Sequence, residues 1–172
     1  MKNEEFIDTV LVNDIGKVIE AGCPYLAFGL IAQGIETLGA LLDEMKLNDI
    51  NLSERRFRNA INTLFNYQTS RYPKYVAESS EYDLYKYLRC GMVHTLSPSG
   101  KIGFTTKCKA EMNGLEHLIL SENGQLILVI EDLFEDFKKA CKKCKNLLVK
   151  KTHSKLKGDV LIISNDVSGG NY

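Results

Sequence analysis

The sequence has no excess of charge of either sign. Its 172 residues include 22 basic and 22 acidic side chains, so the formal net charge is zero. A chain without a positive excess has no overall electrostatic attraction to nucleic acid. The sequence also lacks a glycine-rich phosphate loop, a Gly-x-Gly-x-x-Gly fingerprint and a serine nucleophile elbow. It therefore predicts neither the nucleotide sites nor the serine-hydrolase site that these motifs build.

Cysteine is present but has no framework spacing. An odd number of cysteines without such spacing argues against a disulfide-stapled secreted domain. The first residues, Met1 to Glu5, are charged and contain no apolar signal-peptide core. We therefore expect a cytoplasmic protein. The five cysteines are Cys23, Cys90, Cys108, Cys141 and Cys144.

Long apolar runs are scarce, and the longest extends from Pro24 to Leu42. Its length would suit a membrane span. It also contains Gln33, Glu36 and three glycines, which are costly or unusual in a lipid-facing helix. We therefore expect a central helix of a bundle and no membrane partner.

Charge is distributed unevenly along the chain. Residues 1–137 contain 13 basic and 20 acidic side chains, whereas residues 138–157 contain nine lysines and no acid. Lys142, Lys143 and Lys145 mark this basic stretch as a candidate binding face. Two alternatives stay open, because a lysine-rich helix end is either solvated or in contact with RNA.

Apolar residues at three- and four-residue steps predict a mainly helical protein. Ser53 is a candidate N-cap of the third helix, and Ser79 or Ser80 of the fourth. Three glycines in the second helix suggest close approach by a neighbouring helix. The predicted helices are Glu4–Ala21, Pro24–Met45, Ser53–Asn66, Tyr82–Pro98 and Glu131–Lys150.

The pattern changes after Pro98. Residues 102–106 predict a short strand, and Asn123-Gly124 lies between two apolar runs, which is typical of a β-hairpin. We therefore predict an up-and-down bundle of about five helices, with a small antiparallel hairpin at about residues 115–130 inserted before the last long helix. One helical domain covers residues 1–157. Residues 158–172 form a C-terminal tail with a possible strand at Val160–Ile163.

Several other groups have competing interpretations. Arg55, Arg56 and Arg58 could contact a phosphate backbone, although a solvated helix face is the preferred interpretation. Cys141 and Cys144 could form a zinc site with Cys108 and His153. Because both fall on the apolar stripe of the last helix, we interpret them as core residues and predict no metal and no cofactor. We expect His117, within the predicted hairpin, to be exposed or packed at a strand edge.

The strongest candidates for chemistry are Arg89 and His94, on the fourth helix. A guanidinium offers forked donors to phosphate and stays charged, and an imidazole titrates near neutral pH. Since RNA supplies its own nucleophile, the 2′-hydroxyl, this pair could cleave it without a metal. The competing interpretation is an arginine in a salt bridge at the bundle edge and a histidine that favours a helix C-terminus.

On a regular helical wheel the two side chains lie about 140° apart. They flank a seam of Lys86, Cys90, Val93 and Ser97, in which Cys90 and Val93 point away from the predicted core. We therefore predict a two-fold homodimer through the Lys86/Cys90/Val93 face, which would bring both groups to a shared cleft. Lys86, Cys90 and Ser97 are candidate binding residues beside the pair.

Glu36, isolated in the apolar second helix, has two possible roles. In the first, which we favour, it lies at the bundle edge or pairs with a buried base. In the second, it faces Arg89.

The sequence Arg89-x4-His94 resembles the Arg-x(4–6)-His motif of the HEPN superfamily (higher eukaryote and prokaryote nucleotide-binding). The resemblance covers roughly residues 4–96, with residues 131–150 as a closing helix. It implies a dimeric helical bundle, Arg89 and His94 as the catalytic pair of a metal-independent ribonuclease, and a toxin, antiphage or RNA-processing setting with a possible antitoxin partner. Active members usually carry Asn, Asp or His after the arginine, whereas this chain has Cys90. An inactive relative that binds RNA, a nucleotide or another protein is therefore the alternative.

Overall fold

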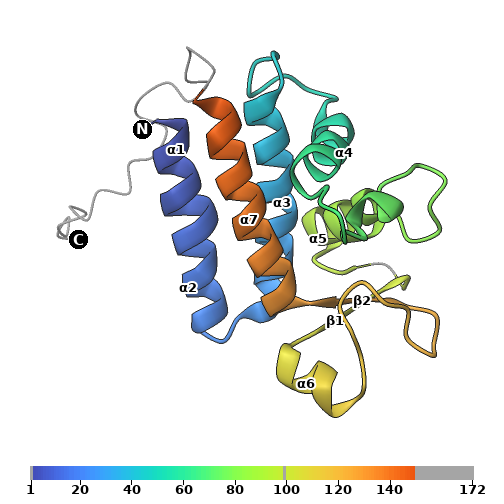
Figure 1. The fold of residues 1–172 in the computed structure, drawn as a ribbon. Helices are drawn as coiled ribbons and strands as arrows, with labels where there is room; N and C mark the ends of the chain where they lie inside the picture. Colours follow the sequence, from blue (N-terminus) through green and yellow to red (C-terminus); the bar gives the residue numbers. More distant parts are fainter. Residues whose placement is uncertain (1, 99, 150–172) are drawn as a thin grey trace, which may run out of the picture.

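The computed structural model describes residues 2–98 and 100–149, and it is mainly helical with a small two-stranded sheet at one end (Figure 1). An N-terminal helical segment, the central helix α3 and the last helix α7 run side by side. The N-terminal segment is continuous, because the π-helical turns of η1 join α1 to α2. The main elements of the bundle are α1 (Asn3–Phe6), η1 (Ile7–Asp14), α2 (Ile15–Glu20), α3 (Pro24–Leu42), α4 (Ser53–Leu64) and α7 (Ile130–Leu148).

Helix α3 is the centre of the bundle, and eleven of its nineteen residues are buried. Two of its glycines make room for neighbours, as the sequence predicted. A Cβ at Gly34 would lie 2.6 Å from the Phe137 ring of α7, and one at Gly39 would lie 2.0 Å from the Arg56 carbonyl oxygen of α4. Helices α7 and α4 therefore approach α3 more closely than any side chain there would allow. The loss of helix propensity, roughly 1 kcal/mol per glycine, is offset by this packing.

Helix α3 is long and apolar enough to cross a membrane by composition alone, and 61% of its most apolar window is buried inside the protein. That degree of burial is typical of the core helix of a bundle.

Helix α4 begins at Ser53, but its N-cap position is Leu52 and no side chain caps it. The prediction that Ser53 caps the helix is therefore wrong, and its hydroxyl instead donates to Glu36 on α3. The prediction of a solvated face for Arg55, Arg56 and Arg58 is also wrong for two of them, Arg56 and Arg58. Arg56 is 4% exposed and donates to Asp43 and to the carbonyls of Leu47 and Lys46 at 2.6–2.9 Å. It holds the loop between α3 and α4 in place.

The predicted fourth helix exists as two consecutive segments, η3 (Tyr85–Cys90), which is π-helical, and α5 (Gly91–Thr95). The Asp83 carboxylate, rather than Ser79 or Ser80, accepts a hydrogen bond from the backbone N–H of Tyr85 at its start. The helix stops at Leu96, which adopts a left-handed φ of 51°. A Cβ at Gly91 would lie 2.5 Å from the Ser97 carbonyl oxygen, so glycine permits the chain to fold back here.

The sheet differs from the predicted antiparallel hairpin. Strand β1 (Ile102–Thr105) pairs in parallel with β2 (Leu126–Val129), and the short helix α6 (Lys107–Met112) lies between them in the chain. Asn123-Gly124 does form a turn, which is followed by one antiparallel bridge from Leu120 to Leu126. The first arm of the hairpin fails as a strand because Leu118 adopts a φ of 58°.

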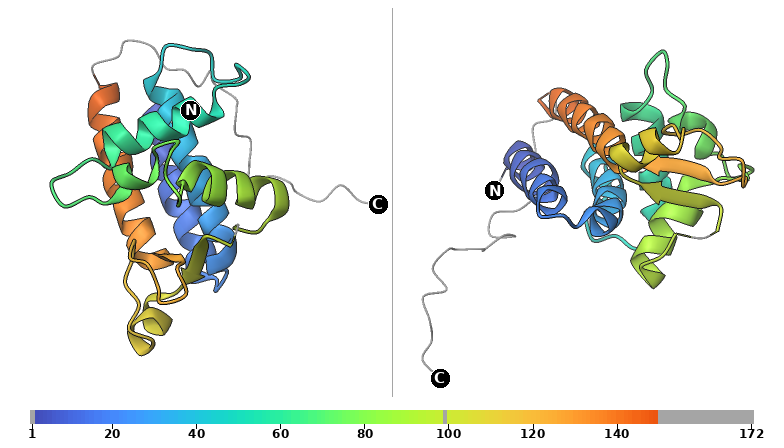
Figure 2. Two further views of the ribbon diagram at one scale, coloured as in Figure 1. Left: turned by 90° about the vertical axis from the view of Figure 1, so that its right-hand side faces the viewer. Right: turned by 90° about the horizontal axis from the view of Figure 1, so that it is seen from below.

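The sheet packs onto the N-terminal end of α3. The ring of Phe104 on β1 stacks on Phe28, with centroids 3.9 Å apart. Figure 2 shows the sheet and α6 below the bundle and η3 and α5 on the side away from α1 and α2.

Cys141 and Cys144 are buried in the main apolar core, as the sequence predicted, and are 1% and 0% exposed. Three predictions lie outside the described residues: the lysines from Lys150 onward, the role of His153 and the strand and tail after residue 157.

Candidate functional site

The Arg89 guanidinium is held by side chains from two other helices. Its Nε donates to Glu36 Oε2 on α3 at 2.6 Å, and its Nη2 donates to Ser53 Oγ on α4 at 3.3 Å. Ser53 Oγ in turn donates to Glu36 Oε1 at 2.8 Å. Glu36 thus faces Arg89, which is the interpretation that we did not favour from the sequence. Both charged side chains are half-buried, 14% exposed for Arg89 and 19% for Glu36.

Tyr85 lies between Arg89 and a second fixed arginine. Its ring centroid is 5.8 Å from the Arg89 guanidinium carbon and 5.5 Å from that of Arg58. Arg58 forms ion pairs of 2.6 Å with both Glu54 and Asp83. Burial, together with a hydrogen bond to the Cys90 thiol, raises the pKa of the Tyr85 phenol to about 12. The phenol is therefore neutral at physiological pH.

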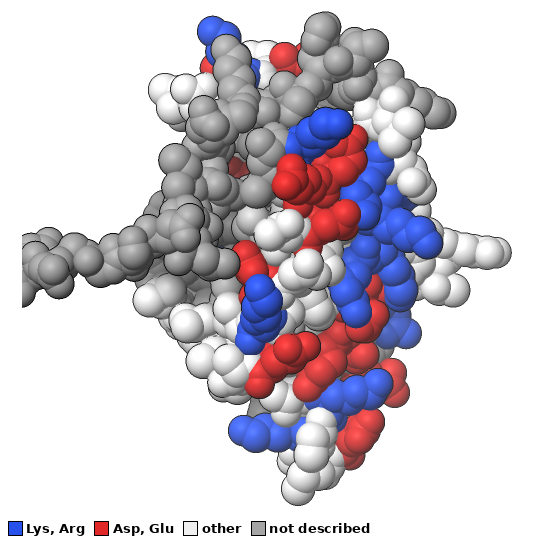
Figure 3. Space-filling view, turned by 90° about the vertical axis from the view of Figure 1, so that its left-hand side faces the viewer, with Lys and Arg blue, Asp and Glu red and all other residues white. Residues whose placement is uncertain are grey.

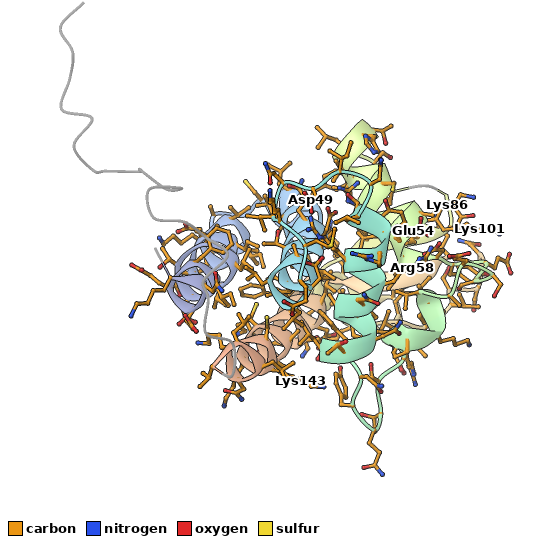
Figure 4. The ribbon with its side chains drawn as sticks, turned by 90° about the horizontal axis from the view of Figure 1, so that it is seen from above. Asp49, Glu54, Arg58, Lys86, Lys101 and Lys143 are labelled. Carbon is orange, nitrogen blue, oxygen red and sulfur yellow. The ribbon has the colours of Figure 1, made fainter. Side chains whose placement is uncertain are left out.

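A cleft of about 390 Å³ adjoins this network between α4 and η3. In Figure 4, Glu54 and Arg58 lie together on α4, on the side of the molecule where Lys86 lies. Two of the predicted binding residues, Lys86 and Cys90, line the cleft. The full lining is Glu54, Arg58, Glu78, Asp83, Tyr85, Lys86 and Cys90. Three carboxylates and two cations give it a slightly negative charge, so the cleft itself is poorly suited to a phosphate.

His94 lies near the C-terminal end of α5, one residue before the helix ends, and is exposed. No hydrogen bond or ion pair joins it to any of the residues that the structure describes. Ser97 is exposed beyond the helix, and Val93 is half-buried. The Tyr25 hydroxyl of α3 donates to the Leu96 carbonyl at 2.7 Å and fixes this end of the segment.

Helix α3 therefore supports the segment at two levels, at Arg89 through Glu36 and beyond His94 through Tyr25. Arg89 has five N–H donors, and its bonds to described residues use two of them. The arrangement can present a fixed guanidinium edge to an anion, while the His94 side chain is exposed to solvent.

The basic face of α7 is largely neutralised among the described residues. Lys145 pairs with Asp8 at 2.6 Å, Lys138 with Glu135 at 2.5 Å and Lys139 with Asp136 at 2.8 Å. On the face seen in Figure 3, basic and acidic side chains lie next to one another.

The three predicted lysines of this face differ in their contacts. Lys145 is paired, Lys143 donates to the Asn66 carbonyl at 3.4 Å, and Lys142 is exposed. Figure 4 places Lys143 on α7, well away from the cleft beside Lys86. These lysines and the Arg89 site are therefore separate surfaces.

His117 is half-buried, and the sequence did not predict its contacts. Its Nδ1 accepts from the Val129 N–H at 3.0 Å, and its Nε2 lies 2.9 Å from the hydroxyl of Tyr72. Tyr72 is buried and hydrogen-bonds to Asp136. Desolvation lowers the pKa of His117 to about 4, although Asp136 and Asp132 oppose the shift. The alternation of apolar residues gave no signal for these contacts, since the segment is not a strand.

Among the described residues, no group of three or more His, Cys, Asp and Glu side chains is arranged to hold a metal ion. Comparison with protein-family models, curated proteins and solved structures gives no match.

Proposed function

We propose that this protein is a HEPN-like ribonuclease that cleaves RNA without a metal ion, with Arg89 and His94 as its catalytic pair. The 2′-hydroxyl attacks the adjacent phosphorus and forms a 2′,3′-cyclic phosphate, while the 5′-oxygen leaves. His94 assists proton transfer, and Arg89 stabilises the negative charge that develops on the phosphoryl oxygens.

The observation that carries this proposal is the state of Arg89. Its guanidinium is anchored through Nε and Nη2, which fixes its orientation and leaves Nη1 for a ligand. An arginine with a purely structural role would be expected to use more of its donors within the fold, as Arg56 does with three bonds to one loop. The exposed His94 on the same helical segment supplies the group that can move a proton.

The proposed site is shared between two copies of the chain. Arg89 is half-buried and donates to Glu36, whereas His94 is exposed. We therefore propose that one copy alone does not present both groups to the same small target. A homodimer through the Lys86/Cys90/Val93 face would place the His94 of one copy near the Arg89 of the other. Light scattering at micromolar concentration should give twice the chain mass, and a clean monomer would contradict this arrangement.

Cleavage is tested by incubating the purified protein with mixed RNA in EDTA. Wild type should cut RNA, and His94→Ala should lose at least about 100-fold in rate, because general acid–base catalysis contributes about that much. His153→Ala serves as a matched histidine control and should retain activity. Cleavage that depends on a divalent ion, or that persists in His94→Ala, would refute the proposal.

A second candidate is an HEPN-like module that binds RNA or a nucleotide without cleaving it, or that binds a partner such as an antitoxin. Two observations favour it: Glu36 neutralises the charge of Arg89, and Cys90 rather than a strongly polar side chain follows the arginine. RNA binding that wild type and His94→Ala share, without cleavage by either, would identify this function.

A further inference from the structure

Glu36 and Ser53 form a two-point support behind Arg89. Glu36 Oε2 accepts from Arg89 Nε at 2.6 Å, and Ser53 Oγ is both the acceptor for Arg89 Nη2 and a donor to Glu36 Oε1. The three side chains come from α3, α4 and η3, which are distant in sequence. Such a closed triangle fixes both the position and the plane of the guanidinium.

The backbone behind this support is tightly constrained. Gly39 lies three residues after Glu36, and it lets α4 approach α3 so closely that a Cβ at this position would lie 2.0 Å from the Arg56 carbonyl oxygen. Arg56 of α4 then donates to Asp43, at the start of the α3–α4 loop, and so ties the loop to α4. The positions of Glu36 and Ser53 relative to each other are therefore set by tight helix packing rather than by a loop.

An ion pair that only stabilised the fold could use any of the three guanidinium nitrogens of Arg89. Here the carboxylate takes Nε, and the hydroxyl takes one hydrogen of Nη2. Nη1 and the second Nη2 hydrogen form no bond to the described residues. These are the donors with which arginine makes a forked contact to two phosphate oxygens.

We infer that Glu36 and Ser53 are positioning residues that hold Arg89 for a phosphate group of RNA. This inference rests on the proposed function, since it names the groups that orient the proposed catalytic arginine. The carboxylate has two opposing effects. It weakens the attraction of Arg89 for a phosphate by cancelling its charge, and it preorganises the guanidinium for the transition state.

These opposing effects predict a split in the kinetic constants. Glu36→Gln removes the negative charge, so KM for a short RNA should fall about 3-fold or more. The same change loosens Arg89, so kcat should fall at least about 10-fold. Ser53→Ala keeps the carboxylate and loses one anchor, so kcat should fall with little change in KM. Glu36→Asp, which keeps the charge, should retain the wild-type KM. A purely structural ion pair would instead lower activity only in proportion to the folded fraction.

A spectroscopic measurement tests the support without relying on turnover. In ¹H–¹⁵N spectra of the full chain, the Arg89 Nε–H should exchange slowly with solvent, and Glu36→Gln or Ser53→Ala should speed its exchange. Arg58→Lys provides an assignment control. Thermal melts of each variant establish that the protein is folded.

The outcomes separate the inference from the proposed function. If wild type cleaves RNA and Glu36→Gln leaves kcat and KM unchanged, the positioning role is refuted while the function stands. Rapid exchange of Arg89 Nε–H in wild type would also refute it. If wild type neither cleaves nor binds RNA, the proposed function fails, and the role of the support in orienting Arg89 for phosphate falls with it.

Discussion

The half-buried His117 should make the protein lose stability in mild acid. Burial lowers the pKa of His117 to about 4, below its ordinary value of 6.5. The folded state therefore binds fewer protons than the unfolded chain between these two pH values. By linkage, the stabilisation is complete above pH 6.5 and is lost as the pH falls toward 4.

The magnitude follows from the difference between the two pKa values, which is about 2.5. Each unit of pKa corresponds to about 1.4 kcal/mol, so protonation of His117 removes about 3 kcal/mol from the free energy of unfolding. About 2.5 kcal/mol of this loss falls between pH 7.5 and pH 4.5. The main physical cause is desolvation, which disfavours the charged imidazole. Protonation of Nδ1 would also break the hydrogen bond that it accepts from the Val129 N–H.

The measurement is urea unfolding followed by circular dichroism, since the chain has no tryptophan for fluorescence. His117→Asn is the informative variant, because its amide oxygen can still accept from Val129 but does not titrate. It should be less stable than wild type at pH 7.5, and the gap should shrink by about 2.5 kcal/mol at pH 4.5. His94→Asn, which changes an exposed histidine, should follow wild type. Parallel stability curves for wild type and His117→Asn would refute the reasoning.

Three further changes test the packing around the site. Gly39→Ala should lower the free energy of unfolding by at least about 2 kcal/mol, because the added methyl meets the Arg56 carbonyl oxygen. Its control, Gly16→Ala, should raise the free energy of unfolding by up to about 1 kcal/mol. Arg56→Lys should cost about 2–4 kcal/mol, because lysine cannot bridge three acceptors at once. Gly91→Ala should cost about 1–3 kcal/mol by displacing Ser97. Urea unfolding measures the stability of all four variants. The packing described would be contradicted if Arg56→Lys or Gly91→Ala were as stable as wild type. It would also be contradicted if Gly39→Ala were as stable as Gly16→Ala.

The helices were predictable because their signals are local. Apolar periodicity located α3, α4 and α7 to within a few residues at each end, and the glycines of α3 correctly indicated close helix contacts. The turn at Asn123-Gly124 was also local and formed as expected. The pairing of strands was not local. Residues 115–120 and 126–129 are close in sequence, yet β2 takes β1 as its strand partner across α6.

Polar residues were harder to place than apolar ones. Arg56 and His117 both lie where local patterns predict exposure, and both are satisfied by backbone groups elsewhere in the fold. A carbonyl or an N–H has no sequence signature, because every residue carries one. Leu96 is the reverse case, since it is an apolar residue of the predicted helix Tyr82–Pro98, yet it is 63% exposed. The helix ends before Leu96, which adopts a left-handed backbone conformation.

The relation between Arg89 and His94 also depends on the form of the helix between them. A wheel drawn at 100° per residue assumes i→i+4 bonding throughout, but Tyr85–Cys90 is π-helical and contains the arginine. Because a π turn holds more residues than an α turn, each residue advances by a smaller angle, and the separation of about 140° between Arg89 and His94 on a regular wheel no longer applies. What fixes the direction of Arg89 is its contact with Glu36 and Ser53, 53 and 36 residues away in the chain. An arginine and a histidine at this spacing therefore define a candidate site only once the helices behind the arginine are known. For this chain, the proposal that Arg89 is held for a ligand rests on its support by α3 and α4.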